Sequence, residues 1–305
     1  MSKEEKIHIP VMKEEVLKYL DVQENKNFID CTFGEGGHTE LILAHNKPNG
    51  KVLAIELDPD LYKIGTKRFQ DFIRSKRLIL VNDSYTNLIS IVQRYKFYPI
   101  NGILFDLGAS MWHFKMSKRG FSFRENEPLD MRYNPKTQSL TAFEIVNYWP
   151  QKHLEEIFKE FGEEKYATKI AQNICEYRKR VKIQTTGKLV EIIRKSIPLS
   201  YQKRRKIHFA TKIFQALRIA VNSELSNIKK GLEEASKVIT PGGRIVVISF
   251  HSLEDRIVKQ YFKKLAKEKK ASLLTKKPIK PKKVEILQNP SARSAKLRAI
   301  IITKQ

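Results

Sequence analysis

Strand-like apolar runs recur along the first third of this chain at nearly constant spacing. Successive runs begin 24, 26 and 24 residues apart, at Phe28, Val52, Leu78 and Gly102. Helix-like patterns fill the intervals between them. Because parallel neighbours need long crossover connections, usually helices, this alternation predicts an α/β fold: a doubly wound, Rossmann-like and mostly parallel sheet with helices on both faces.

A long interval separates the fourth of these strands from the next convincing one, at 244–250. Part of the interval, 208–239, has the pattern of an amphipathic helix that is broken near Asn222. The rest must be an insertion. We therefore predict a discontinuous sheet domain over residues 1–110 and 208–305, with an inserted domain over residues 111–207.

The insertion has the signature of a helical domain. Apolar side chains recur at helical spacing in three segments, 154–161, 170–177 and 189–197. Thr141 and Glu144 have the spacing of a capping box, which marks the start of a further helix. These apolar stripes are predicted to form the core of the insertion.

The loop after the first strand has the composition of a ligand-binding turn. Gly34, Gly36 and Gly37 let the backbone approach a ligand closely, and the helix that begins near Thr39 offers unpaired N–H groups. Glu56 ends the second strand at the spacing where an acidic side chain meets a ribose hydroxyl in nucleotide-binding folds. A tight turn that binds nothing is the alternative. The acidic residue favours a ligand that contains adenosine.

Two features of this loop argue against a dinucleotide. The dinucleotide fingerprint G-x-G-x-x-G requires a third glycine, and Thr39 stands in that position. Asp30 precedes the loop, where its negative charge would repel a pyrophosphate. Both features favour S-adenosylmethionine (SAM) as the cofactor and disfavour a dehydrogenase.

Polar residues follow the other strands at the edge where open α/β sheets bind ligands. Tyr85 follows the third strand and is placed to flank an adenine, and Asp106 ends the fourth. If the acceptor is the exocyclic amine of a base, an oxygen must draw on its N–H, because the nitrogen lone pair is delocalised into the ring. Candidates for this oxygen are Asp106, Ser110 and the segment 249–255. The alternative role of Asp106 is to position the cofactor.

The segment that joins the sheet to the insertion alternates aromatic and basic residues. This pattern is typical of sites that stack unpaired bases and hold phosphates. A hydrophobic lid with solvated charges is the alternative. The predicted substrate-binding residues are Arg119, Phe121, Phe123 and Arg132, together with His251 after the fifth strand, for which a structural role is also open.

The charge of the chain indicates a polyanionic partner. The net charge is +25, and residues 256–305 hold sixteen Lys or Arg against two Glu. The insertion holds 21 basic against 11 acidic residues and includes the run Lys203–Lys206. A solvated, lysine-rich tail is the alternative, and nucleic acid is favoured.

The cysteines exclude two common frameworks. Cys31 and Cys175 are the only two, with no C-x-x-C motif, so neither a disulfide framework nor a thiolate metal site is expected. Cys31 lies on the first strand and is predicted to be a core residue. The first residues lack a hydrophobic signal core, and no apolar run approaches the length of a membrane span. We expect a cytoplasmic protein with no metal and no membrane contact.

Longer motifs carry a resemblance to a known family across residues 8–298. The matching segments are His8-Ile-Pro-Val11, Asp30-Cys-Thr-Phe-Gly-Glu-Gly-Gly-His38, Phe105-Asp-Leu-Gly108, Arg119-Gly-Phe-Ser-Phe123, Pro128-Leu-Asp-Met-Arg132, Phe214-Gln-Ala-Leu-Arg218, Val221-Asn-Ser-Glu-Leu225 and Ile248-Ser-Phe-His-Ser-Leu-Glu-Asp-Arg256. Together they resemble the MraW/RsmH family of bacterial SAM-dependent methyltransferases of small-subunit ribosomal RNA. The resemblance implies a class I methyltransferase sheet, a helical insertion, and methylation of N4 of a cytosine in the decoding region of 16S rRNA.

The resemblance also implies which residues contact the cofactor. Carried over position by position, these contacts fall on Gly36, Gly37, His38, Glu56, Tyr85, Asp106 and His113. Glu56 stands where the family more often has Asp, and Tyr85 where it more often has Phe; both keep the chemistry. His113 stands in place of a glutamine, and Met111 and Trp112 precede it, so we predict weaker SAM binding or a shifted fit of the substrate.

Three other functions remain open at this point. A methyltransferase that acts on amines in DNA is disfavoured, because the sequence after Asp106 lacks the Asp/Asn/Ser-Pro-Pro-Tyr/Phe motif. A non-catalytic RNA-binding assembly factor would keep the basic surface and hold SAM as a structural ligand. A dehydrogenase is the third. The implied partner is 16S rRNA within the small ribosomal subunit, preferred over naked RNA, and a homodimer is left open.

Overall fold

The computed structural model describes residues 10–204 and 207–303. His8 and Ile9 of the first motif, and Arg205 and Lys206 of the basic run, lie outside the described residues. Within the described ranges, no helix is both long enough and apolar enough to cross a membrane.

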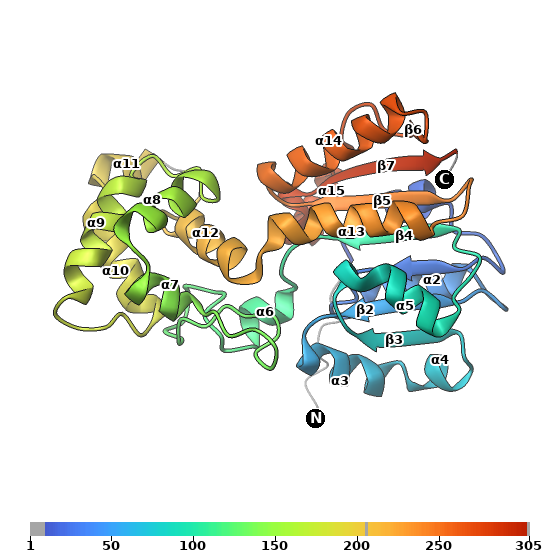
Figure 1. The fold of residues 1–305 in the computed structure, drawn as a ribbon, viewed down its shortest axis with the longest axis horizontal. Coiled ribbons are helices and arrows are strands. Elements are labelled where there is room, and N and C mark those ends of the chain that lie inside the picture. The colour runs from blue at the N-terminus through green and yellow to red at the C-terminus, as the bar shows by residue number, and fades with distance from the viewer. Residues whose placement is uncertain (1–9, 205–206, 304–305) are drawn as a thin grey trace. The chain divides into compact units, whose positions relative to one another are not determined.

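Seven strands form one sheet. They are β1 (Phe28–Asp30), β2 (Val52–Glu56), β3 (Leu78–Asn82), β4 (Gly102–Asp106), β5 (Arg244–Ser249), β6 (Ala271–Leu273) and β7 (Lys296–Ile302). Their order across the sheet is β3-β2-β1-β4-β5-β7-β6 (Figure 1). The first five strands are parallel, and the order reverses between β1 and β4. The prediction of a doubly wound, mostly parallel class I sheet is confirmed.

The strand pair β6–β7 was not predicted, because the sequence of this region was interpreted as a basic tail. β7 is antiparallel to both β5 and β6, and its register pairs Arg244 with Ile301 and Ser249 with Lys296. Ile279, within the basic loop, also exchanges two backbone hydrogen bonds with Leu297 at 2.9 Å each. The lysine-rich C-terminal part is therefore an integral part of the sheet.

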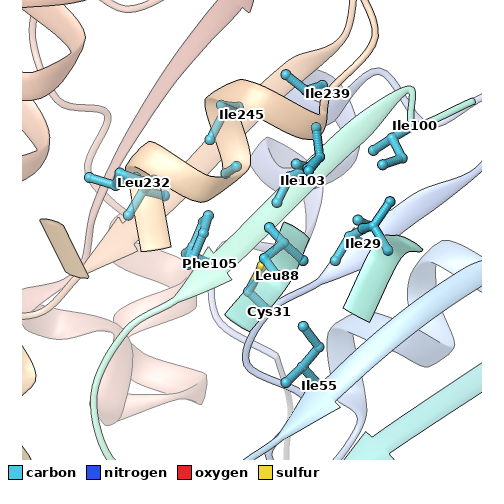
Figure 2. Packing of buried hydrophobic residues seen from close by; sticks show 14 of the residues in the cluster. Ile29, Cys31, Ile55, Leu88, Ile100, Ile103, Phe105, Leu232, Ile239 and Ile245 are labelled. Atoms are coloured by element: carbon cyan, nitrogen blue, oxygen red, sulfur yellow. The ribbon is translucent and has the colours of Figure 1, made fainter. Parts of the chain in front are cut away.

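Helices cover both faces of this sheet. They are α1 (Lys13–Leu20), α2 (Gly37–His45), α3 (Pro59–Arg68), α4 (Gln70–Arg74), α5 (Leu88–Tyr95), α13 (Glu224–Val238), α14 (Ser252–Lys267) and α15 (Lys283–Gln288), with two 3₁₀ turns at Tyr85–Asn87 and Pro290–Ser294. Side chains of α5, α13 and α14 pack on one face, and those of α1 and α2 on the other. Figure 2 shows the first of these cores, in which Cys31 lies among apolar side chains. Burial raises the pKa of the Cys31 thiol well above its ordinary value, as its predicted core role requires.

The residues between β4 and α13 are helical and have a core of their own. The helices are α6 (Met111–Lys115), α7 (Ala142–Tyr148), α8 (Gln151–Glu160), α9 (Ala167–Arg178), α10 (Thr186–Ser196), α11 (Leu199–Arg204) and α12 (Thr211–Asn222). The predicted capping box is present at α7: the hydroxyl of Thr141 accepts from the N–H of Glu144 at 3.1 Å, and the carboxylate of Glu144 accepts from the N–H of Thr141 at 2.7 Å.

The chain divides into two compact units: residues up to Gly108 together with those from Leu225 onward, and Ala109–Glu224. We call them the sheet unit and the helical unit. The second boundary was predicted at 207/208, before α12. In the structure, apolar side chains of α12 such as Phe214 and Leu217 belong to the core of the helical unit, so the division falls after that helix. The helix break expected near Asn222 is present at Ser223, where φ is 50°.

Candidate active site

Polar side chains gather at the carboxyl edge of the sheet unit. Asp30, Glu56 and Asp106 end β1, β2 and β4, Tyr85 follows β3, and His251 follows β5. Because these five strands are parallel, their carboxyl ends meet at one edge, where open α/β sheets bind ligands. All five residues were predicted as site residues or as part of the cofactor loop.

The turn between β1 and α2 depends on glycine. Gly36 is the N-cap of α2 and has φ 82°, a left-handed conformation that side chains disfavour. A Cβ atom at Gly36 would also lie 2.5 Å from the ring of Phe69 and 2.8 Å from that of Phe33. Backbone conformation and packing therefore both require glycine, and they place the first turn of α2 at the edge of the sheet.

We expect Gly36→Ala to destabilise the sheet unit by about 2 to 4 kcal/mol, the sum of a left-handed backbone penalty and an overpacking penalty. Gly242→Ala is a matched control, because Gly242 also has a positive φ of 84° but a Cβ there meets nothing within 4 Å. The control should cost only about 1 kcal/mol. Urea unfolding followed by far-UV circular dichroism measures both. Equal costs would show that the aromatic contacts do not constrain this turn.

Glu56 connects β2 to the glycine turn. One carboxylate oxygen accepts from the N–H of Gly34 and the other from the N–H of Asp58, each at 2.7 Å. The residue is 7% exposed, and this burial raises its pKa to about 8, although the two N–H groups favour the ionised form. The carbonyl oxygen of the carboxyl group keeps a second lone pair in either protonation state, so Glu56 can still accept from a ribose hydroxyl.

Asp30 has a structural role that the sequence did not reveal. It is fully buried, and its carboxylate accepts from the N–H of Thr32 at 3.1 Å and from the hydroxyl of Thr39 at 2.7 Å. Burial raises its pKa. Thr39, which occupies the third glycine position of the dinucleotide fingerprint, therefore fastens the start of α2 to the end of β1.

His38 and Asp106 form a buried pair with unused hydrogen-bonding capacity. His38 Nε2 lies 3.5 Å from Asp106 Oδ2, and the N–H of Asp106 donates to the hydroxyl of Thr32 at 2.7 Å. Burial lowers the pKa of His38, but Asp106 and Asp30 outweigh it, so the pKa is raised overall. The neighbouring carboxyl groups thus favour the protonated form of the His38 imidazole.

Three polar atoms of this pair are buried without a hydrogen-bond partner among the described residues. They are Nδ1 and Nε2 of His38 and Oδ1 of Asp106. A buried polar atom without a partner costs about 1 to 3 kcal/mol, so such atoms mark places where a ligand supplies the partner. The carboxylate of Asp106 suits the ammonium group of an amino-acid moiety, and the imidazole of His38 suits its carboxylate.

Tyr85 is held in place by two apolar neighbours. Its ring meets that of Phe105 edge-on at 5.5 Å, with an interplanar angle of 83°. Gly231 of α13 approaches so closely that a Cβ there would lie 2.5 Å from the Tyr85 ring. The tyrosine remains partly exposed. Its position flanking an adenine stays a prediction, and the role of Gly231 was not foreseen.

His251 caps α14. Its Nδ1 accepts from the N–H of Glu254, whose carboxylate in turn accepts from the N–H groups of Phe250 at 2.8 Å and His251 at 3.2 Å. Nε2 lies 3.1 Å from the Glu254 carboxylate without hydrogen-bond alignment. The structural role that the sequence left open is therefore present, and contact with substrate stays a prediction.

The other predicted site residues belong to the helical unit. Ser110 is the N-cap of α6, and its hydroxyl lies 2.9 Å from Nδ1 of His113. His113 is 5% exposed and packs against the rings of Phe121 and Tyr133, with centroids 5.0 Å apart in each case. Its contact with the cofactor, and the catalytic role of Ser110, stay predictions.

The aromatic and basic residues of 118–132 make mainly internal contacts. The guanidinium of Arg119 donates to the carbonyls of Arg132 and Tyr133 at 2.9 and 3.0 Å. Phe121 is buried and stacks on Tyr133. Arg132 pairs with the carboxylate of Asp130 at 2.7 Å, and the ring of Phe123 stacks on that of His208 at 4.6 Å. These contacts resemble the hydrophobic lid given as the alternative, and the substrate-binding role of the four residues stays a prediction.

Sequence reasoning missed Glu285. This residue of α15 accepts from the backbone N–H of Met12 at 2.5 Å, and its charge contributes to the raised pKa of His38. From the sequence, Glu285 was interpreted only as one of two acidic residues in a basic tail. The apolar stretch of β7 was the available signal in the sequence, because a strand there holds the C-terminal segment against the sheet.

The chain matches the model of the MraW methylase family over residues 5–303. It is also similar to proteins named ribosomal RNA small subunit methyltransferase H. The one from Sulfurihydrogenibium sp. (strain YO3AOP1) is 46% identical over 291 residues, which cover 95% of this chain and 97% of the relative. Those from Pseudothermotoga lettingae and Thermotoga neapolitana are each 42% identical, over 96% and 100% of this chain and 97% and 99% of the relative.

Proposed function

Since the chain belongs to the MraW methylase family, we propose that it transfers the methyl group of SAM to N4 of a cytosine in the decoding region of 16S rRNA. SAM-dependent methylation of small-subunit ribosomal RNA is the activity that the family and the names of its relatives support. The cytosine, its N4 atom and its place in the decoding region are our proposal. The observation that carries it is the His38–Asp106 pair beside the glycine turn, in which three buried polar atoms have no hydrogen-bond partner in the described part of the chain.

The residues at the edge of the sheet fit SAM. Glu56 can accept from the ribose hydroxyls, and Tyr85 can flank the adenine. The imidazole of His38 can contact the carboxylate of the methionine end, and the carboxylate of Asp106 can contact its ammonium group. Bound SAM supplies an electrophilic methyl group on a positively charged sulfur.

Asp106 is our candidate for the group that activates the amine. The lone pair of a cytosine amine is delocalised into the ring, so an acceptor must draw on its N–H for the nitrogen to become nucleophilic. When the nitrogen takes up the methyl group it becomes positively charged and must release one proton. Asp106 Oδ2 faces His38, whereas Oδ1 has no hydrogen-bond partner within residues 10–204 and 207–303 and can accept first the hydrogen bond and then this proton.

The charge of the chain suits an assembled ribosomal particle. The 58 Lys and Arg residues exceed the 33 Asp and Glu residues, and the excess is shared by the helical insertion and the C-terminal segment. A particle whose surface is rich in phosphate groups attracts a chain with this excess of positive charge. We therefore propose that the small subunit is the substrate.

The experiment is transfer of labelled methyl from SAM to small subunits that lack this modification. We expect label on N4 of a single decoding-region cytosine, none on fully modified subunits, and a slower reaction on protein-free rRNA. Equal rates on rRNA and subunits would contradict the preference for the particle. Label on duplex DNA would favour a DNA amino-methyltransferase. SAM binding without transfer to any of these would favour a non-catalytic assembly factor.

A further inference from the structure

Tyr148, the last residue of α7 in the helical unit, is exposed without an evident role in packing. It is 61% exposed, and the ammonium of Lys182 lies 4.2 Å from the centre of its ring. The ring of Phe143 meets it edge-on at 6.1 Å. A single exposed aromatic residue is ordinary, but a ring with a cation beside it can stack on a base while the cation pairs with a phosphate.

The backbone on both sides of this pair is fixed. Asn147, which precedes Tyr148, donates its amide to the carbonyl of Ile183 and accepts from the N–H of Ile183, both at 2.9 Å. Ile183 directly follows Lys182. Arg178 donates to the carbonyls of Val146 and Trp149 at 2.7 and 2.6 Å, which flank Asn147 and Tyr148. Tyr148 and Lys182 are therefore held together before any partner binds.

The segment next to Tyr148 is strongly basic. Residues 178–182 read Arg-Lys-Arg-Val-Lys, and all but Arg178 are exposed. Lys179 pairs with Glu176 at 2.8 Å. Val181, 53% exposed, adds an apolar side chain to the same segment. A stacking ring, an apolar side chain and cations on a fixed backbone form a combination that recognises unpaired nucleotides.

We propose that Tyr148, Arg180, Val181 and Lys182 form a surface, the Tyr148 surface, that binds single-stranded RNA. A base stacks on Tyr148, and the adjacent phosphates pair with Arg180 and Lys182. This inference rests on the proposed function, since it identifies a place where the helical unit holds the rRNA. It also differs from the prediction for residues 118–132, in which Phe121 and Arg119 are buried.

The test uses the full chain and a labelled, unstructured 12-nucleotide oligocytidine, with binding followed by fluorescence anisotropy. Tyr148→Ala should weaken binding about tenfold, the effect of losing one stacked base, and Tyr148→Phe should restore it. Lys182→Gln should weaken binding and reduce the slope of log affinity against log salt by about one. Tyr95→Ala is the matched control, because Tyr95 is also the last residue of its helix, is 41% exposed, and lies in the sheet unit.

A second measurement separates this inference from the proposed function. With small subunits as substrate, Tyr148→Ala should raise KM about tenfold and leave kcat, SAM affinity and thermal stability unchanged. Oligonucleotide binding by Tyr148→Ala equal to that of the native chain would overturn the inference. A raised KM on subunits with unchanged oligonucleotide binding would also overturn it, and would assign the surface to a protein partner. If the native chain methylates nothing yet binds RNA through Tyr148, the inference stands and the proposed function fails.

Discussion

Replacing Asp106 with alanine should lower kcat for methyl transfer by about 10³-fold, within the range that removal of a positioned proton acceptor produces. Oδ1 of the carboxylate is buried and makes no hydrogen bond to any residue that the structure describes, and Oδ2 lies 3.5 Å from His38 Nε2. Its backbone N–H, which donates to Thr32, survives the substitution, so the end of β4 should keep its position. Single-turnover transfer to small subunits measures the effect on chemistry directly.

Asp106→Asn is the matched variant for this experiment. It keeps the size of the side chain and one acceptor oxygen, but it loses the negative charge and the capacity to take up a proton. If Asp106 accepts the proton of the amine, the asparagine variant should be nearly as slow as the alanine variant while it still binds SAM. If Asp106 only positions the cofactor, SAM affinity should fall in both variants and kcat at saturating SAM should recover. Native kcat in both variants would contradict either role.

The second large effect is on the stability of the sheet unit as a function of pH. Burial raises the pKa of Glu56 from its ordinary value of 4.5 to about 8. Between these two values the folded chain holds a proton that the unfolded chain has released. The free energy of unfolding contributed by this group is therefore highest below pH 4.5 and falls by up to about 1.4 kcal/mol per pH unit as the pH rises toward 8.

Glu56→Gln should remove this dependence, because glutamine does not titrate. It is expected to be less stable at low pH, since its amide group must face one of the two N–H donors, of Gly34 or Asp58. The comparison is the slope of unfolding free energy against pH, from urea unfolding between pH 5 and 8, with Glu160→Gln as an exposed control. Parallel slopes for the native chain and Glu56→Gln would show that Glu56 is ionised throughout.

The choice of probe matters for these stability measurements. Both tryptophans, Trp112 and Trp149, lie in the helical unit, so intrinsic tryptophan fluorescence reports on that unit. Glu56 and Gly36 lie in the sheet unit. Amide hydrogen exchange of strand β2 follows the affected region directly and complements circular dichroism.

Local signals in the sequence predicted much of the fold. The starts of β1 to β5, the capping box of Thr141 and Glu144, and the helix break before α13 all follow from periodicity and neighbouring residues. β7 was missed because Lys296 and Arg298 interrupt its apolar pattern. In the structure, Arg298 donates to the carboxylate of Asp255 at 2.6 and 3.2 Å, which allows a charged residue in a buried strand. That partner is 43 residues away in the chain, beyond what local pattern can show.

The site residues that lie within sequence motifs could be predicted. The contacts that depend on tertiary packing could not. Glu56 and Asp106 end strands whose carboxyl edge was foreseen. The bonds from Thr39 to Asp30 and from Asp106 to Thr32 were not foreseen, because no pattern in the sequence assigned a bonding role to either threonine. The pattern of aromatic and basic residues predicted that Phe121 stacks on a base, and it did not single out Tyr148. Burial of the one and exposure of the other follow from tertiary structure.

Each unit contains hydrophobic clusters made entirely of its own residues. Mutational effects at distant sites that share no partner are nearly additive. A substitution that repacks the helices around Phe158 is therefore expected to have little effect on the packing of the strands that carry Glu56 and Asp106. Under the proposed function, the RNA contacts of the helical unit can change without changes in the strands that carry the candidate site.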